Sequence, residues 1–135
     1  FNANLSGWDV SKVTNMSSMF SATSAFNADI SRWNVSNVTD MSNMFDNAST
    51  FNQDLSMWHD KLLNVTDMSN MFSWVSPYNQ DLNKWKIAGP NVNVENMIGL
   101  RGPNGVDMSC KYLPHNFTNA QITASGAKDY TTCLP

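Results

Sequence analysis

The chain has 135 residues, a formal net charge of −3 and an isoelectric point near 5.0. With 8 Lys and Arg against 11 Asp and Glu, it lacks the clustered positive charge that a nucleic-acid surface needs, and we expect no nucleic-acid partner. No apolar run approaches the roughly 18 residues of a membrane span, so no membrane span is expected. The length suits one domain.

The most informative pattern is a repeat with a spacing of about 25 residues. Its units are residues 1–25, 26–50, 51–77 and 78–100, and they open on Phe1, Phe26, Phe51 and Tyr78. Tryptophans and methionines recur at fixed phases within the units, namely Trp8, Trp33, Trp58 and Trp85, and Met16, Met41, Met68 and Met97. Such a period predicts a solenoid, because one unit cannot bury its apolar side alone.

Each unit is expected to hold one short strand and one helical segment. In the second unit, Trp33 and Val35 alternate around Asn34, which predicts a strand within 29–37. Residues 36–48 place apolar side chains at Val38, Met41, Met44, Phe45 and Ala48, a spacing typical of a helix or of 3₁₀ turns. The third unit has two extra residues within 59–63, and the fourth drifts from the pattern after residue 85.

The phrase "FNxDISxWxVSNVTDMSxMFxxA" resembles the repeat of the BspA-like leucine-rich-repeat surface proteins. The resemblance is close over residues 1–77 and loose over 78–100, while 101–135 does not match. It implies an α/β repeat solenoid of right-handed coils, each with a short parallel strand and a short helical or 3₁₀ segment. It also implies display at the cell surface, a role in adhesion, and no catalytic residues.

The tail from residue 101 to 135 is read as a C-terminal cap. Cys110 and Cys133, the two cysteines of the chain, flank a segment rich in turn-forming residues. One disulfide that closes this cap is our prediction, and two unrelated free thiols are the alternative. A disulfide of this loop length stabilises by about 3 kcal/mol and favours an extracellular or otherwise oxidising location.

Two polar rows accompany the repeat. An asparagine ladder is expected from Asn2, Asn27, Asn52 and Asn79, since stacked coils bring equivalent residues within hydrogen-bonding reach. The next polar row is Asn4, Asp29, Asp54 and Asp81, whose members either cap turns or share a calcium ion. We favour turn caps and predict no metal, because the dense acidic spacing of a calcium loop is absent.

The tryptophan row is expected in the core, and outward-facing rings would instead form a stacking platform for sugars.

Seven Asn-X-Ser/Thr sequons form a third pattern. They are candidate N-glycosylation sites at Asn4, Asn15, Asn34, Asn37, Asn47, Asn64 and Asn116. The number exceeds what chance predicts, although the repeats copy one another and inflate it.

Catalysis is not expected. The two histidines, His59 and His115, show no metal-ligand spacing, and no nucleophile elbow, phosphate loop or zinc motif is present. We therefore predict a non-enzymatic protein without cofactors.

Two functions remain for an extracellular or cell-surface protein of this kind. The first is a structural subunit, with the sequons as candidate sites for N-linked sugars, that associates with other copies. The chain starts in phase on a repeat, so either upstream residues are missing or the open first unit docks head-to-tail on a neighbouring copy and builds a filament. The alternative is an adhesion module that contacts a protein or glycan through the face of the solenoid.

Overall fold

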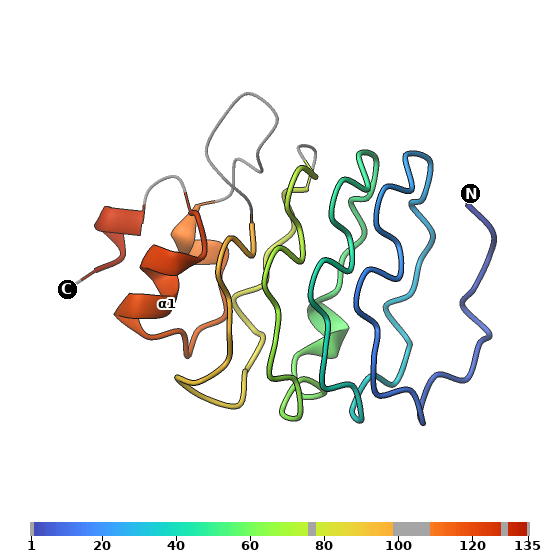
Figure 1. Cartoon of the computed structure of the whole chain (residues 1–135), viewed down its shortest axis with the longest axis horizontal. Helices are drawn as coiled ribbons and strands as arrows, with labels where there is room; N and C mark the ends of the chain where they lie inside the picture. Colours follow the sequence, from blue (N-terminus) through green and yellow to red (C-terminus); the bar gives the residue numbers. More distant parts are fainter. Residues whose placement is uncertain (1, 76–77, 99–108, 128–129, 135) are drawn as a thin grey trace.

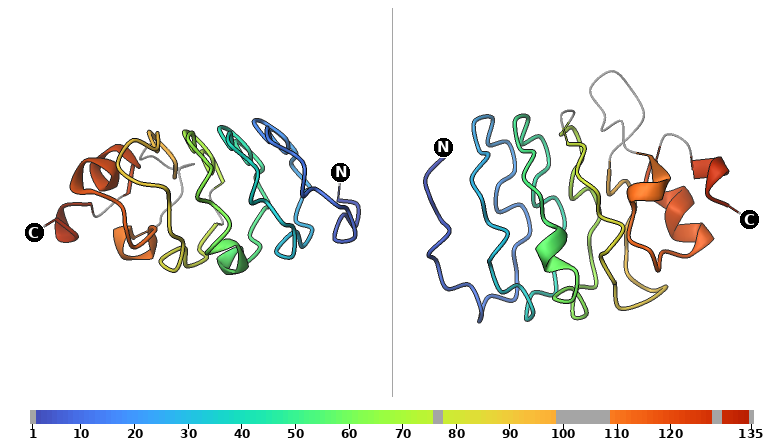
Figure 2. Two further views of the ribbon diagram at one scale, coloured as in Figure 1. Left: turned by 90° about the horizontal axis from the view of Figure 1, so that it is seen from below. Right: turned by 180° about the vertical axis from the view of Figure 1, so that it is seen from behind.

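The computed structural model describes residues 2–75, 78–98, 109–127 and 130–134. Successive passes of the chain lie side by side along the long axis as flattened coils, which we number 1 to 4: residues 2–25, 26–50, 51–75 and 78–98 (Figures 1 and 2). A C-terminal segment, residues 109–127 and 130–134, lies against coil 4. The regular elements are η1 (Ser56–Trp58), η2 (Cys110–Tyr112), α1 (Asn119–Ala124) and η3 (Tyr130–Thr132).

The predicted α/β solenoid is wrong. In the described residues there is no sheet, and the coils share only three isolated parallel bridges, Asn15 with Asp40, Asp40 with Asp67, and Asp67 with Asn93. The one α-helix in this part of the chain, α1, lies outside the repeats. It is neither long nor apolar enough to cross a membrane.

The segment expected to be helical, 36–48, is a run of tight turns. Met44 N–H donates to the Met41 carbonyl and Asp46 N–H to the Asn43 carbonyl, both three residues back. Asn43 and Asn47 adopt the left-handed conformation, with φ of 55° and 58°, which interrupts any helix at each of these residues. Asparagine tolerates this conformation better than most residues, so the apolar spacing is that of a helix while the backbone is not.

These turns give the contacts between coils a direction. Met16, Ser18, Phe20 and Ala22 donate their N–H groups to carbonyls of coil 2 at 2.8–2.9 Å. The same four positions of coil 2 donate to coil 3, and the first three of them in coil 3, Met68, Asn70 and Phe72, donate to coil 4. We call residues 16–22, 41–47 and 68–74 the turn ladder. Left-handed residues recur at every fourth position of it, as Ser18 and Ala22 do in coil 1. Every second N–H donates to the next coil, while Met19 and Ser21 donate their N–H groups to carbonyls three residues back in the same coil. In a parallel β-strand those carbonyls would accept from the neighbouring strand, so these turns explain why no strand forms.

The segment expected to be a strand, 29–37, is also built from turns. Trp33 N–H donates to the Ile30 carbonyl at 3.1 Å, and Ser31 and Ser36 donate their N–H groups to the Asp29 and Asn34 side chains. Here the coils are joined through side chains. Each buried indole donates to a carbonyl of the preceding coil: Trp33 to Leu5 at 3.0 Å, Trp58 to Ile30 at 3.3 Å, Trp85 to Leu55 at 2.9 Å.

The core between these two sides consists of rows of equivalent apolar residues. Phe26, Phe51 and Tyr78 stack with ring centroids 5.7 and 5.9 Å apart, and a second row, Phe20, Phe45 and Phe72, stacks beside it. The prediction that Met97 shares the phase of Met68 is wrong. Phe72 N–H donates to the Met97 carbonyl, as Phe45 N–H donates to the Met71 carbonyl, so Met97 is the coil 4 equivalent of Met71. Val94 is then the coil 4 equivalent of Met68.

The C-terminal segment ends the turn ladder. Asn96 and Ile98 of coil 4 donate to the carbonyls of Ala124 and Ser125, which lie at the C-terminal end of α1 where carbonyls lack helical partners. The buried Gln121 side chain donates to the Gly89 and Val92 carbonyls and fastens α1 to coil 4.

The predicted disulfide Cys110–Cys133 is confirmed. The boundary expected at residue 100/101 lies outside the described residues, and the division into repeat units and cap stays a prediction.

Candidate functional site

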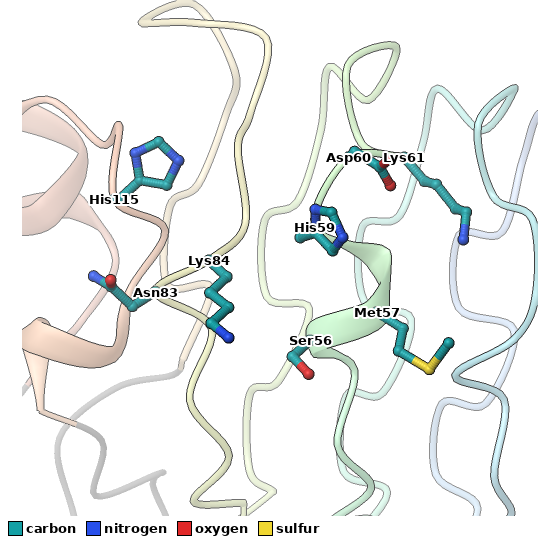
Figure 3. Close-up of a pocket in the computed structure, with 8 residues that line it drawn as sticks. All are labelled: Ser56, Met57, His59, Asp60, Lys61, Asn83, Lys84 and His115. Atoms are coloured by element: carbon teal, nitrogen blue, oxygen red, sulfur yellow. The ribbon is translucent and has the colours of Figure 1, made fainter.

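An open groove of about 770 Å³ lies on the side of the stack. One wall comes from coil 3, and the other comes from coil 4 and the C-terminal segment (Figure 3). We call it the coil 3–4 groove, and its lining residues are Ser56, Met57, His59, Asp60, Lys61, Asn83, Lys84 and His115.

Backbone hydrogen bonds fix both walls relative to one another. Lys86 N–H donates to the His59 carbonyl at 3.1 Å, which ties coil 4 to the wall of coil 3. His115 N–H donates to the Asn83 carbonyl at 3.1 Å, and the Asn83 amide donates to the Lys111 carbonyl at 3.2 Å. The groove is therefore built on anchored backbone rather than on a free loop, which favours a preformed ligand site.

The groove exists because the repeat is interrupted there. The third unit places η1 and the two extra residues of 59–63 on this side of the stack, whereas the other coils carry short turns. His59, Asp60 and Lys84 are exposed. No side-chain hydrogen bond involves Lys61, Lys84 or either histidine among the described residues, so these groups are available to a ligand.

The sequence reveals the insertion at 59–63 but not the groove. His59 and His115 show no metal-ligand spacing, and nothing in the sequence places residues so far apart in the chain at one site. The structure brings both to one hollow, although no group of three or more His, Cys, Asp or Glu side chains in the described residues is arranged to hold a metal ion. The insertion was the only signal that could have located one wall.

The four expected ladder asparagines lie in one row along the stack. Asn27 N–H donates to the Asn2 side-chain oxygen at 2.8 Å, Asn52 N–H to that of Asn27 at 2.9 Å, and Asn79 N–H to that of Asn52 at 3.1 Å. Gln53 extends the row by donating to the Asn27 carbonyl at 2.7 Å. These side chains satisfy backbone groups of adjacent coils, which is a structural use.

The row of Asn4, Asp29, Asp54 and Asp81 has its oxygens engaged in turns. Each accepts the N–H of the residue two positions later, at 2.8–3.0 Å. The side chain and backbone of Ser31 donate to Asp29 and lower the pKa of its carboxyl. The Ser11 side chain and backbone lower the pKa of Asp9 in the same way. These contacts fit the turn-cap interpretation.

The same turn explains much of the sequon excess. Asn4, Asn15 and Asn34 accept the N–H of a serine two residues on, and Asp29 and Asp67 do so at comparable turns where no sugar can attach. An Asx turn followed by Ser therefore produces Asn-X-Ser for a structural reason.

The sequon asparagines differ in what their amide nitrogens do. Asn4, Asn15, Asn34 and Asn47 are exposed, and no hydrogen bond from their amide nitrogens is found in the described part of the chain. Asn37 and Asn64 donate to the Ser11 and Ser36 carbonyls of the preceding coil, both at 2.7 Å. Asn116 both donates to and accepts from the backbone of Ile87, so a sugar at its amide nitrogen would disturb this pair. The first group is the more compatible with glycosylation.

The tryptophan row is oriented inward at Trp33, Trp58 and Trp85, all of which are buried. A sugar-stacking platform made of these rings is therefore not available. Trp8 is 56% exposed, because no coil covers the outer face of coil 1, and Trp74 is 47% exposed at the tip of coil 3.

Comparison with known proteins places the repeats in a family. Residues 1–101 match the model of the family described as Mycoplasma protein of unknown function, DUF285, and the chain belongs to that family. It is a repeat family associated with BspA-like surface proteins, so the resemblance is confirmed at this level, while the specific 25-residue motif stays a prediction. Neither a curated protein nor a solved structure matches the chain.

Proposed function

We propose that the chain is a non-enzymatic module of an extracellular or cell-surface protein and binds a protein or glycan ligand in the coil 3–4 groove. The observation that carries this proposal is the contrast in how side chains are used. Along the coils, Asn and Trp side chains satisfy neighbouring coils and Asp and Ser side chains satisfy local turns. In contrast, no side-chain hydrogen bond or ion pair of the charged groove residues is found in the part of the chain that the structure describes.

Two further observations support the proposal. The disulfide Cys110–Cys133 suits an oxidising compartment, which favours the extracellular location. His59 and His115 are exposed and neither donates to a carboxylate in the described residues, so neither is held as a general base would be. We therefore assign the groove to binding rather than to catalysis.

The test is saturable binding of the fluorescently labelled protein to intact animal epithelial cells, read by flow cytometry. Met57 is 49% exposed and lines the groove, while Leu63 is 50% exposed and does not. Met57→Arg places a large cation on the coil 3 wall of the groove and is expected to reduce binding at least ten-fold, and Leu63→Arg is the matched control that preserves it. Equal binding by both variants would contradict the proposal.

The second candidate is the self-assembling structural subunit. Trp8 and Met19 of coil 1 are exposed large apolar side chains, which favours contact with another coil. However, a head-to-tail contact between copies needs a donor edge, and the N–H groups of Asn96 and Ile98 in coil 4 are already bonded to the C-terminal segment. This favours the binding module. Sedimentation velocity over a hundred-fold concentration range distinguishes the two, since a binding module stays monomeric and a filament subunit does not.

A further inference from the structure

We infer that the ligand of the coil 3–4 groove is an acidic sugar, a glycan unit that carries one carboxylate among its hydroxyl groups. This inference rests on the proposed function, since it names the ligand class of the same groove. It follows from the charges in the groove, from the groups around them, and from the carboxylates on the far side of Lys84.

The first step concerns the cation at the centre of the groove. Lys84 extends between the two walls, while Lys61 is directed toward the opposite end, beside Asp60 (Figure 3). In the described part of the chain, neither lysine forms an ion pair. A carboxylate brought to Lys84 would gain a charge-assisted hydrogen bond, which is about twice as strong as a neutral one.

The second step concerns the other polar groups that line the groove. Ser56 supplies a hydroxyl and Asn83 an amide oxygen, while Asp60 supplies a carboxylate acceptor farther along the coil 3 wall, beyond His59, and all three suit the hydroxyl groups of a sugar (Figure 3). Inorganic phosphate in its dianionic form carries two negative charges and a single hydroxyl, so it offers these groups one donor and more charge for the carboxylates to repel. The groove therefore favours a ligand with both a negative group and hydroxyl donors.

The third step excludes polyanions. A smaller hollow of about 200 Å³ adjoins the groove, and it is lined by Asp54 and Asp81 together with Lys84. These two carboxylates would repel a chain of negative charges that runs past Lys84, as in nucleic acid or a sulfated polysaccharide. A single carboxylate at Lys84 meets these charges once and is offset by the lysine, whereas a polyanion meets them along its length. A volume of 770 Å³ is within the range of small-ligand sites.

The experiment compares matched sugars on the full 135-residue protein by isothermal titration calorimetry. 3′-Sialyllactose carries a carboxylate and lactose does not, while inorganic phosphate and heparin represent anions without the required pattern. We expect 3′-sialyllactose to bind about ten-fold or more tightly than lactose, and phosphate and heparin to bind no better than lactose.

Two variants assign this preference to the groove. Lys84→Gln is expected to reduce 3′-sialyllactose binding to the level of lactose, while Lys12→Gln, at an exposed lysine of coil 1, is expected to leave it unchanged. Equal binding of both sugars, stronger binding of heparin, or an unaffected Lys84→Gln variant would overturn the inference. If no sugar binds while cell binding remains sensitive to Met57→Arg, the acidic-sugar inference fails and the proposed function stands.

Discussion

The two sides of each coil are held together by different parts of the chain. On the turn-ladder side, backbone N–H groups of one coil donate to carbonyls of the next, as from Phe45 to Met71 at 2.9 Å. On the tryptophan side, local turns use the backbone groups and the indole of Trp58 reaches the preceding coil instead. Substitutions of side chains should therefore be most damaging on the tryptophan side, and changes of backbone conformation on the ladder side.

The largest effect is expected from removing a buried indole. Trp58→Ala should lower the free energy of unfolding by about 3–5 kcal/mol, because it leaves a cavity beside Trp85 and removes the donor to the Ile30 carbonyl. Trp8 holds the same repeat position but is exposed, so Trp8→Ala should change stability by only about 0.5 kcal/mol. Urea denaturation measures the free energy of unfolding of both variants. Equal losses would contradict the conclusion that side chains hold the coils together on the tryptophan side.

The next effect concerns the end of the ladder. Replacing both Cys110 and Cys133 by Ser should lower the free energy of unfolding by about 3 kcal/mol, since the bridge spans a separation of 23 residues. Loosening of the C-terminal segment should also expose the amides of Asn96 and Ile98, whose acceptors lie in that segment. Hydrogen exchange should accelerate at these two amides and not at the Trp58 indole. Equal acceleration at the Trp58 indole would contradict the conclusion that the C-terminal segment specifically protects the last coil of the turn ladder.

A smaller effect is expected from the left-handed residues of the ladder. Asn43→Val should destabilise by about 1–2 kcal/mol, because a β-branched side chain strongly disfavours φ of 55°. Asn43→Gly, which adopts this conformation freely, is the control and should lose less than half as much. Thermal unfolding of the pair checks the result, and a Val variant as stable as the Gly variant would contradict the backbone explanation.

The smallest effect concerns a hydroxyl between the two sides. The Tyr78 hydroxyl is buried and has no hydrogen-bond partner among the described residues, so Tyr78→Phe should leave stability unchanged or raise it by about 1 kcal/mol. Burial, with a contribution from Asp54, raises the pKa of Tyr78. The folded protein therefore keeps this proton where the unfolded chain releases it, so the contribution to stability holds at lower pH and declines as pH rises above about 10.

The measurement for Tyr78 is the urea midpoint at pH 8 and pH 10.5. The midpoint of the parent protein should decline more between these values than that of Tyr78→Phe. Identical declines would mean that the phenol is not protected from solvent in the folded state.

Parts of this molecule were predictable from local sequence, and others depended on backbone conformation. The apolar rows, exemplified by the stacked Phe26 and Phe51, and the disulfide follow from repeat spacing and cysteine position. The strand and helix predictions were wrong, because left-handed residues such as Asn43 change the backbone without changing the apolar spacing. The register of Met97 was also misjudged, since the segment around Gly89 and Pro90 obscures the phase.

The groove could be predicted only in part. The extra residues in 59–63 mark an irregularity on one wall, but nothing in the sequence connects them with His115 on the other wall. That proximity arises from the hydrogen bond between His115 and Asn83, which depends on how the C-terminal segment folds back.

The direction of the turn ladder also affects how the molecule meets its own copies. The exposed edge of coil 1 presents carbonyls at Asn15, Ser17, Met19 and Ser21, the positions whose equivalents in coil 2 accept from coil 1. Two such edges brought face to face would oppose oxygen to oxygen. Edge strands in many proteins need charged residues or prolines to prevent self-pairing. Here the orientation of the peptide groups itself disfavours the face-to-face pairing of two coil 1 edges.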